Sequence, residues 1–163
     1  MELKEILKYE NEDVVYRFQK LFEVKEEEAI ELFRDTLRWL YAIDLNNKLF
    51  TSGEIDFTIG INDDLLILDE MWHNFILFTK EYDSFCNDYF GYFIHHQPMT
   101  KIKSIQENDE IISNYENIQN ERKLFFKKQY SFIYDLLGKD ILVKWHKEWP
   151  IKYSIDKIRQ LRK

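Results

Sequence analysis

The longest uninterrupted helical pattern in the chain runs from Asp109 to Leu137, and this pattern sets the class of fold. Apolar side chains recur along it at the three- and four-residue spacing of an amphipathic helix. Asn108 stands at the N-cap position, and Gly138 stands where the helix would end. The two apolar rows are Ile111, Tyr115, Ile118, Phe125, Phe132 and Leu136, and beside them Phe126, Tyr130, Ile133 and Leu137. At about 1.5 Å per residue the helix would be roughly 44 Å long, so we expect it to form the backbone of the fold.

Shorter helical patterns occupy most of the remaining sequence. One follows Asn11, which has the side chain of a good N-cap, and a second covers Lys25 to Asp44. Ser154 would cap a short final helix. Only four glycines and two prolines interrupt the chain, which argues against long linkers. We predict an all-α fold of five or six helices in one compact domain spanning residues 1–163, with a basic C-terminal helix at 151–163.

The helical spacing lapses between Leu45 and Asp64. Gly53 and Gly60 lie here, and the run I-D-F-T-I-G-I alternates like a strand. A short β excursion or hairpin near residues 48–61 would fit this pattern. After Gly138, the run I-L-V-K-W-H-K-E-W-P fits either a short strand or a helical turn that Pro150 closes.

The charge of the chain is acidic overall and basic at its C-terminal end. The net charge is −7, which argues against a general nucleic-acid-binding surface. The segment from Lys144 to Lys163 holds seven basic and two acidic residues, a local charge of +5. This segment is either a tail that docks on the acidic body of the protein or an arm that binds a partner protein. We expect no membrane association and a cytoplasmic location, in keeping with a single cysteine and an N-terminal stretch that alternates charged residues with leucine.

The reactive side chains gather between Asp69 and Pro98, where three of the four histidines and the only cysteine are found. Asp69 and His73 are four residues apart, so a helix would place them side by side. An aspartate in that position favours the imidazolium form and could fix the tautomer of a general base, a metal ligand or a ligand-clamping group. A surface ion pair at the edge of the core would have the same spacing.

The second half of this stretch holds Tyr82, Cys86, His95 and His96. We expect a helix break near Thr79, whose side chain could cap the second helix, and a helix end at Gly91. Cys86 is either a small core residue or a thiol nucleophile activated by a histidine. The extended exit towards Pro98 makes His95 and His96 point in opposite directions, so only one of them can easily face the same site as His73.

A zinc site is one reading of these residues. His73, Cys86 and one of His95 or His96, with His96 as the preferred choice, would give a mixed nitrogen and sulfur ligand set. The sequence offers neither a C-x-x-C pair nor an H-E-x-x-H motif. In one straight helix, His73 and Cys86 would also lie about 140° away from alignment. Our first expectation is therefore that no cofactor is bound, with zinc as the alternative.

The motifs D-E-M-W-H, F-G-Y-F-I-H-H-Q-P, Y-D-L-L-G and W-H-K-E-W-P, taken together, resemble the glycine-rich domain-containing protein-like family. The resemblance covers roughly residues 22–150. The positions that match the family pattern are Asp69, Trp72, His73, Tyr82, Cys86, Gly91, His95, His96 and Pro98. Phe75 stands where family members often carry a second histidine, and the glycine-rich tail is missing. The resemblance implies no established catalytic activity, and it implies binding or regulation for some members.

Three functions follow from these observations. The first is a non-enzymatic binding module for a protein partner, formed by the D-x-x-W-H helix and the basic C-terminal segment. Its ligand-binding residues would be Asp69, Trp72, His73, Tyr82, His95 and His96. The second is a metal- or thiol-dependent enzyme that uses His73, Cys86 and one of His95 or His96, with His73 and Cys86 as candidate catalytic residues. The third is a structural role with the function elsewhere in the protein, in which a buried polar-aromatic network only holds the helices in register. Its members would be Asp69, Trp72, His73, Tyr82, Cys86 and His95.

Overall fold

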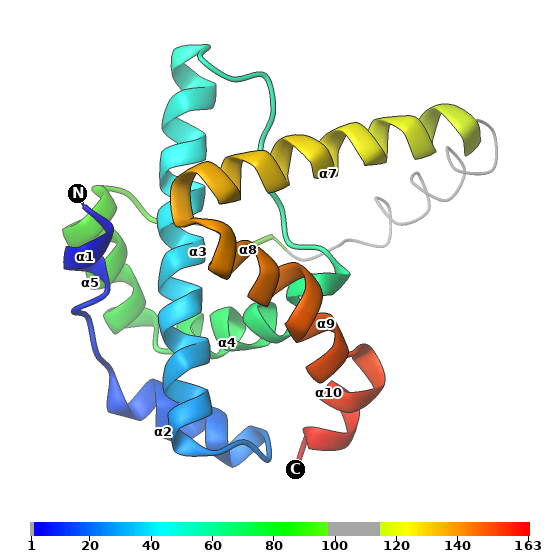
Figure 1. Ribbon diagram of the computed structural model, residues 1–163. Helices are drawn as coiled ribbons and strands as arrows, with labels where there is room; N and C mark the ends of the chain where they lie inside the picture. The colour runs from blue at the N-terminus through cyan, green and yellow to red at the C-terminus, as the bar shows by residue number, and fades with distance from the viewer. Residues whose placement is uncertain (1, 98–114) are drawn as a thin grey trace.

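The computed structural model describes residues 2–97 and 115–163, and every regular element in these two ranges is helical (Figure 1). The predicted all-α class is confirmed. The helices are α1 (Leu3–Ile6), α2 (Glu12–Leu21), α3 (Glu26–Ser52), α4 (Leu66–Ile76), α5 (Thr79–Phe90), α7 (Tyr115–Leu137), α8 (Lys139–Val143), α9 (Trp149–Lys152) and α10 (Ile155–Leu161). A 3₁₀ turn, η1 (Asp63–Leu65), precedes α4, and a π-helical turn, η2 (Lys144–Glu148), joins α8 to α9. The prediction of five or six helices is too low, because the N-terminal segment and the chain after Gly138 form several short helices.

Helix α3 is the centre of the fold. It is 27 residues long, and α1, α2, α4 and α7 all pack against it. Figure 1 shows α1 and α5 on one side of α3, α2 across its lower end, and the run from α8 to α10 on the other side. We expected the helix 109–137 to have this central role. Its first six residues lie outside the described ranges, and from residue 117 onward α7 buries only Gln129 and Ile133. That expectation was wrong for the part of the helix that is described.

Helix α3 continues beyond Asp44 into the segment for which we predicted a strand. It ends at Ser52, and Gly53 follows in the left-handed conformation at φ 79°. Residues 54–62 then run beside α3 without pairing to another strand. The amide of Ile59 donates to the side chain of Asn46 on α3 at 3.0 Å, and the amide of Gly60 donates to the side chain of Gln129 at 2.9 Å. Side-chain amides thus take the place of a partner strand, so the predicted β excursion near 48–61 was wrong.

The helix boundaries agree with most of the predicted caps. Asn11 accepts a hydrogen bond from the amide of Val14, and Ser154 accepts one from the amide of Lys157. The break between α4 and α5 is present, but Thr79 does not cap α5, because no side chain accepts a bond at its start. Gly91 and Gly138 end α5 and α7 with positive φ angles. The run after Gly138 is helical, and Pro150 lies in the first turn of α9 rather than closing the run.

The core is aromatic where α3, α4 and α5 meet. Phe33, Phe75 and Phe85 pack edge to face between α3, α4 and α5. Trp39 of α3 meets Trp145 of η2 on the opposite side, with ring centroids 5.9 Å apart. None of the helices described here is long and apolar enough to cross a membrane.

The basic C-terminal segment contacts acidic residues of the same chain. Lys144 lies 2.6 Å from both Asp35 and Glu31 on α3, Lys152 lies 2.8 Å from Glu28, and Arg162 pairs with Glu70. Burial raises the pKa of Asp35, although Lys144 and Arg38 oppose this. Several of the basic residues of this segment are therefore already paired within the fold.

Candidate functional site

Helix α4 and the extended segment after Gly91 bring three of the predicted residues into one cluster. Asp69 and His73 lie one turn apart on α4, and the left-handed Gly91 turns the chain back so that His96 reaches them. The side-chain ligand atoms of Asp69, His73 and His96 all lie within 4.8 Å of one another. We call these residues the Asp-His-His cluster. Among the described residues, this is the group of histidine and carboxylate side chains close enough to share a metal ion.

The ring of His96 holds the cluster together. Its Nε2 lies 2.7 Å from Oδ1 of Asp69, at hydrogen-bond distance. The same ring stacks on Trp72 at a centroid distance of 4.1 Å, and on His73 at 4.6 Å with only 8° between the planes. Nδ1 of His73 is 3.6 Å from Oδ2 of Asp69, which is an ion-pair distance rather than a hydrogen bond. His96 is largely buried, at 15% side-chain exposure, whereas His73 is 49% exposed.

A buried hydrogen-bond chain lies directly behind the cluster. The indole N–H of Trp72 donates to the Tyr82 hydroxyl at 2.9 Å, and that hydroxyl donates to the carbonyl of Ile94 at 2.8 Å. Tyr82 has no exposed surface, and burial raises the pKa of its hydroxyl well above the usual range. The chain connects α4, α5 and the segment that carries His96, so it fixes the position from which His96 approaches Asp69.

Cys86 and His95 do not join the cluster. Cys86 is fully buried, and burial raises the pKa of its thiol, which favours the unreactive protonated form. The ring of His95 is exposed and packs on Phe93 at 4.9 Å. The structure thus brings together two of the three predicted metal ligands, His73 and His96, with Asp69 in the place of Cys86. His95 and His96 face different surroundings, as the extended exit predicted.

The Asp-His-His cluster lines a cleft of about 860 Å³. The loop of residues 59–62 and the α3 residues Trp39, Ile43 and Asn47 line the same cleft. The other lining residues are Asp63, Leu66, Asp69, Trp72, His73 and the segment 92–97. The lining therefore combines apolar side chains such as those of Ile59 and Ile61 with the carboxylates of Asp63 and Asp69. Sequence reasoning missed the loop and the α3 residues, because only the tertiary fold brings them into the same cleft as α4.

A second polar cluster lies at η2, and its residues do not line this cleft. Nδ1 of His146 is 3.0 Å from Oδ2 of Asp64, and the Tyr130 hydroxyl donates to the same oxygen at 3.2 Å. Because an ionised carboxylate can only accept, Nδ1 of His146 carries the hydrogen. Its Nε2 is buried and has no partner among the described residues. The sequence showed this histidine only as part of the W-H-K-E-W-P motif.

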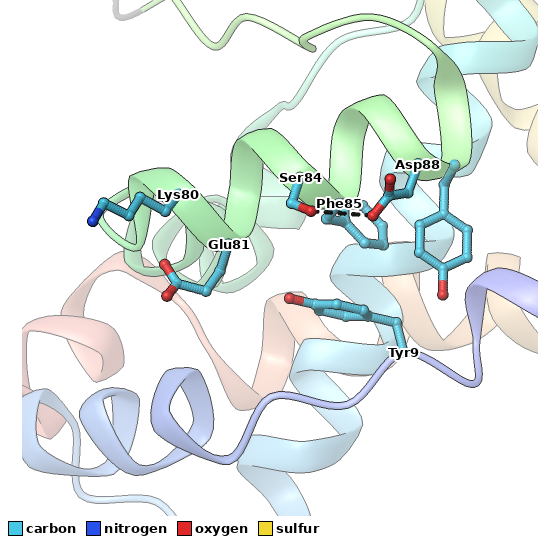
Figure 2. A pocket seen from close by; sticks show the side chains of 7 residues that line it. Tyr9, Lys80, Glu81, Ser84, Phe85 and Asp88 are labelled. Atoms are coloured by element: carbon cyan, nitrogen blue, oxygen red, sulfur yellow. Dashed lines mark hydrogen bonds between the residues drawn. The ribbon is translucent and has the colours of Figure 1, made fainter.

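A further pocket, of about 570 Å³, lies between Tyr9 and helix α5 (Figure 2). Figure 2 shows the Tyr9 ring facing the helix, with Glu81 to one side and a hydrogen bond from Ser84 to Asp88. This bond is 3.1 Å long. None of the site residues that we predicted from the sequence lines this pocket. The charged and hydroxyl side chains of α5 around it are exposed. The cleft beside the Asp-His-His cluster is therefore the stronger candidate.

Part of the chain, including part of the cleft lining, matches the model of a protein family. Residues 65–131 match the model of a family described as UCP032817-like. The matched region covers less than half of the chain and includes α4, α5 and all three residues of the Asp-His-His cluster. No curated protein and no solved structure matched the chain.

Proposed function

We propose that the protein is a non-enzymatic binding module whose site is the cleft beside the Asp-His-His cluster. The observation that carries this proposal is the convergence of the stacked Trp72, His96 and His73 rings with Asp69 in the wall of one cleft of about 860 Å³. A largely apolar cleft with a few converging polar groups is the usual form of a ligand site. We also propose that the chain is related to glycine-rich domain-containing proteins, on the motif residues of α4 and the segment after Gly91.

The ligand that fits the cleft best is a short segment of a partner protein. Ile59, Ile61 and Phe93 offer an apolar surface for one or two anchoring side chains. Asp63 and Asp69 add negative charge at the same cleft, which favours a basic residue next to the anchor. The exposed His73 ring can add a contact to the bound segment. A cytoplasmic location of the module remains a prediction.

Thiol catalysis has less support. A nucleophilic cysteine needs access to substrate and a lowered pKa, and Cys86 is buried with a raised pKa. The basic C-terminal segment also has less support as a free partner-binding arm, since Lys144, Lys152 and Arg162 pair with acidic residues of the chain. The cleft therefore carries the proposal without Cys86 and without this segment.

Substitution of Gly60 tests the cleft. A Cβ atom at Gly60 would meet nothing within 4 Å, and its backbone is not left-handed, so Gly60→Phe should fill the cleft while the fold is kept. Ser131→Phe, on the exposed side of α7, is the matched control. Peptides selected from a random display library on the wild-type protein should bind Gly60→Phe at least about tenfold more weakly and Ser131→Phe equally well.

The position of the bound peptide can be read from the tryptophan indole signals in an NMR spectrum. Trp39 and Trp72 line the cleft, whereas Trp145 and Trp149 do not. Binding in the cleft should shift the first two signals more than the others. Peptides that bind Gly60→Phe as tightly as the wild type, or that leave Trp39 and Trp72 unshifted, would reject the cleft as the binding site.

A further inference from the structure

We infer that Asp69, His73 and His96 bind a divalent transition metal ion of the zinc class, with the remaining coordination positions open to the cleft. The metal would need no peptide in the cleft, so this inference goes beyond the proposed function. It also differs from the ligand set that the sequence indicated, because a carboxylate replaces the thiol of Cys86.

The donor atoms of the cluster suit such an ion. Two imidazole nitrogens and one carboxylate oxygen are ligands that zinc and its neighbours accept, and three protein ligands with an open position are typical of exchangeable sites. Ligands of a tetrahedral zinc ion lie about 2.0–2.2 Å from the metal, which separates them by roughly 3.3 Å. Oδ1 of Asp69 lies 2.7 Å from His96 Nε2, Oδ2 of Asp69 lies 3.6 Å from His73 Nδ1, and the ligand atoms of the three residues all lie within 4.8 Å of one another. The two separations from Asp69 are close to that requirement.

The side chain of His73 must rotate before all three residues can coordinate one metal ion. The lone pair of an imidazole nitrogen lies in the ring plane, so the two stacked and nearly parallel rings cannot both point at one ion. His73 is the ring that can move, because it is half exposed and its contact with Asp69 is long. The stacking of His96 on Trp72 can persist, since the ion would lie in the plane of His96. The proton on Nε2 of His96 would move to Nδ1 or to solvent when the metal binds.

The surroundings hold two of the ligands in place beforehand. Trp72, through its bonds to Tyr82 and onward to Ile94, fixes the face against which His96 packs. Asp69 is on a regular helix, and its carboxylate already faces His96. Because imidazole donors suit zinc, cobalt and nickel better than calcium or magnesium, the site should bind the first group selectively. The open positions would face the cleft, where water could complete the coordination of the metal.

Titration of the metal-free protein with Co²⁺, followed by visible absorption and by competition with Zn²⁺, tests the inference. We expect one equivalent of Co²⁺ to bind, Zn²⁺ to displace it, and Mg²⁺ to leave it bound. His73→Ala, His96→Ala and Asp69→Asn should each weaken Co²⁺ binding by more than about 10- to 100-fold, the range that loss of a mere outer-shell partner already reaches. His95→Ala is the matched control, because His95 is adjacent in sequence but outside the cluster, and it should bind like the wild type.

A loss of Co²⁺ binding identifies a metal ligand only in a variant that is folded. His73→Ala is the most informative of the variants, because an exposed helix residue can be replaced without loss of the core. Equal Co²⁺ affinity of His73→Ala, His96→Ala and the wild type would overturn the inference. So would the absence of stoichiometric binding by the wild type, or an equal loss in His95→Ala.

The same proteins separate this inference from the proposed function. Gly60→Phe fills the cleft but leaves the three ligands unchanged, so it should still bind Co²⁺ while losing the selected peptides. A wild-type protein that binds peptides but no metal would reject the metal site alone. A protein that binds Co²⁺ but no peptide would reject the peptide site alone.

Discussion

Tyr82 is the single residue on which the geometry of the site depends most. Its hydroxyl accepts the indole N–H of Trp72 and donates to the carbonyl of Ile94, so it joins α4 to the segment that carries His96. All of these polar groups are buried, where water cannot replace a lost partner. The cluster that faces the cleft is positioned by this buried bond chain.

Removing that hydroxyl should destabilise the fold. Tyr82→Phe leaves the Trp72 indole and the Ile94 carbonyl without partners, at a cost of about 1–3 kcal/mol for a buried unpaired group. We expect this loss in the free energy of unfolding measured in urea. Tyr92→Phe is the control, because Tyr92 is 36% exposed and its hydroxyl accepts a long hydrogen bond, 3.4 Å, from the side chain of Asn47. If both variants lost the same free energy of unfolding, the buried hydrogen-bond chain would contribute no more to stability than the exposed Tyr92 hydroxyl.

The buried network is smaller than the sequence suggested. His73 and His95 are exposed, so the network comprises Tyr82, Trp72 and the buried side of His96. His73→Ala should therefore have little effect on the melting temperature, in contrast to the loss expected for a buried partner. The pairing of Asp69 with His73 could be predicted because four-residue spacing on a helix fixes it. The meeting of both with His96 could not, because it depends on the turn at Gly91 and on the Tyr82 bond.

The π-helical turn η2 is the most unusual element of the fold. The amide of Trp149 donates to the carbonyl of Lys144, five residues earlier, and Pro150 has no N–H to continue the regular pattern. This wider turn directs Trp145 into the core and His146 towards Asp64. Such a turn has no periodic signature, which is why the sequence left this run undecided between strand and helix. The length of α3 was underestimated for a related reason. The buried Asn46 interrupts its apolar row, and in the structure the side chain of Asn46 accepts a hydrogen bond from the amide of Ile59.

His146 should make this element sensitive to acid. Burial lowers the pKa of His146 below its ordinary 6.5, and the hydrogen bond to Asp64 opposes this only in part. The unfolded chain therefore binds a proton more readily than the folded protein. The contribution of His146 to stability is complete above about pH 6.5 and is lost as the pH falls towards the folded pKa, with a slope of at most about 1.4 kcal/mol per pH unit.

Urea denaturation between about pH 7 and pH 5.5 measures this effect. His146→Asn keeps a donor near Asp64 but cannot titrate, so its free energy of unfolding should fall less than that of the wild type over this range. His95→Asn, at an exposed position, should follow the wild type. The same pH dependence in the wild type and in His146→Asn would mean that another group controls the acid response.

At the scale of the whole molecule, the C-terminal segment closes the fold onto its N-terminal part. The amide of Glu23 donates to the carbonyl of Leu161 at 2.8 Å, and the amide of Lys163 donates to the carbonyl of Leu21 at 2.9 Å. Phe22 and Arg162 thus form a single antiparallel bridge, and Figure 1 shows the C-terminus next to the end of α2. The basic composition of this segment suggested docking through charge. The structure adds an apolar contact, because Ile158 of α10 is buried.

We expect the apolar contact to hold the segment more firmly than the charges do. Ile158→Ala removes a buried side chain and should cost at least about 2 kcal/mol of unfolding free energy. Arg162→Ala removes a partly exposed ion pair with Glu70 but keeps the backbone bridge, and should cost less than about 1 kcal/mol. Urea denaturation of both variants at low and high salt makes the comparison, because salt weakens only the ion pair. If Arg162→Ala were the more costly change and its cost vanished in salt, charge would hold the segment in place, and an acidic partner could compete for it.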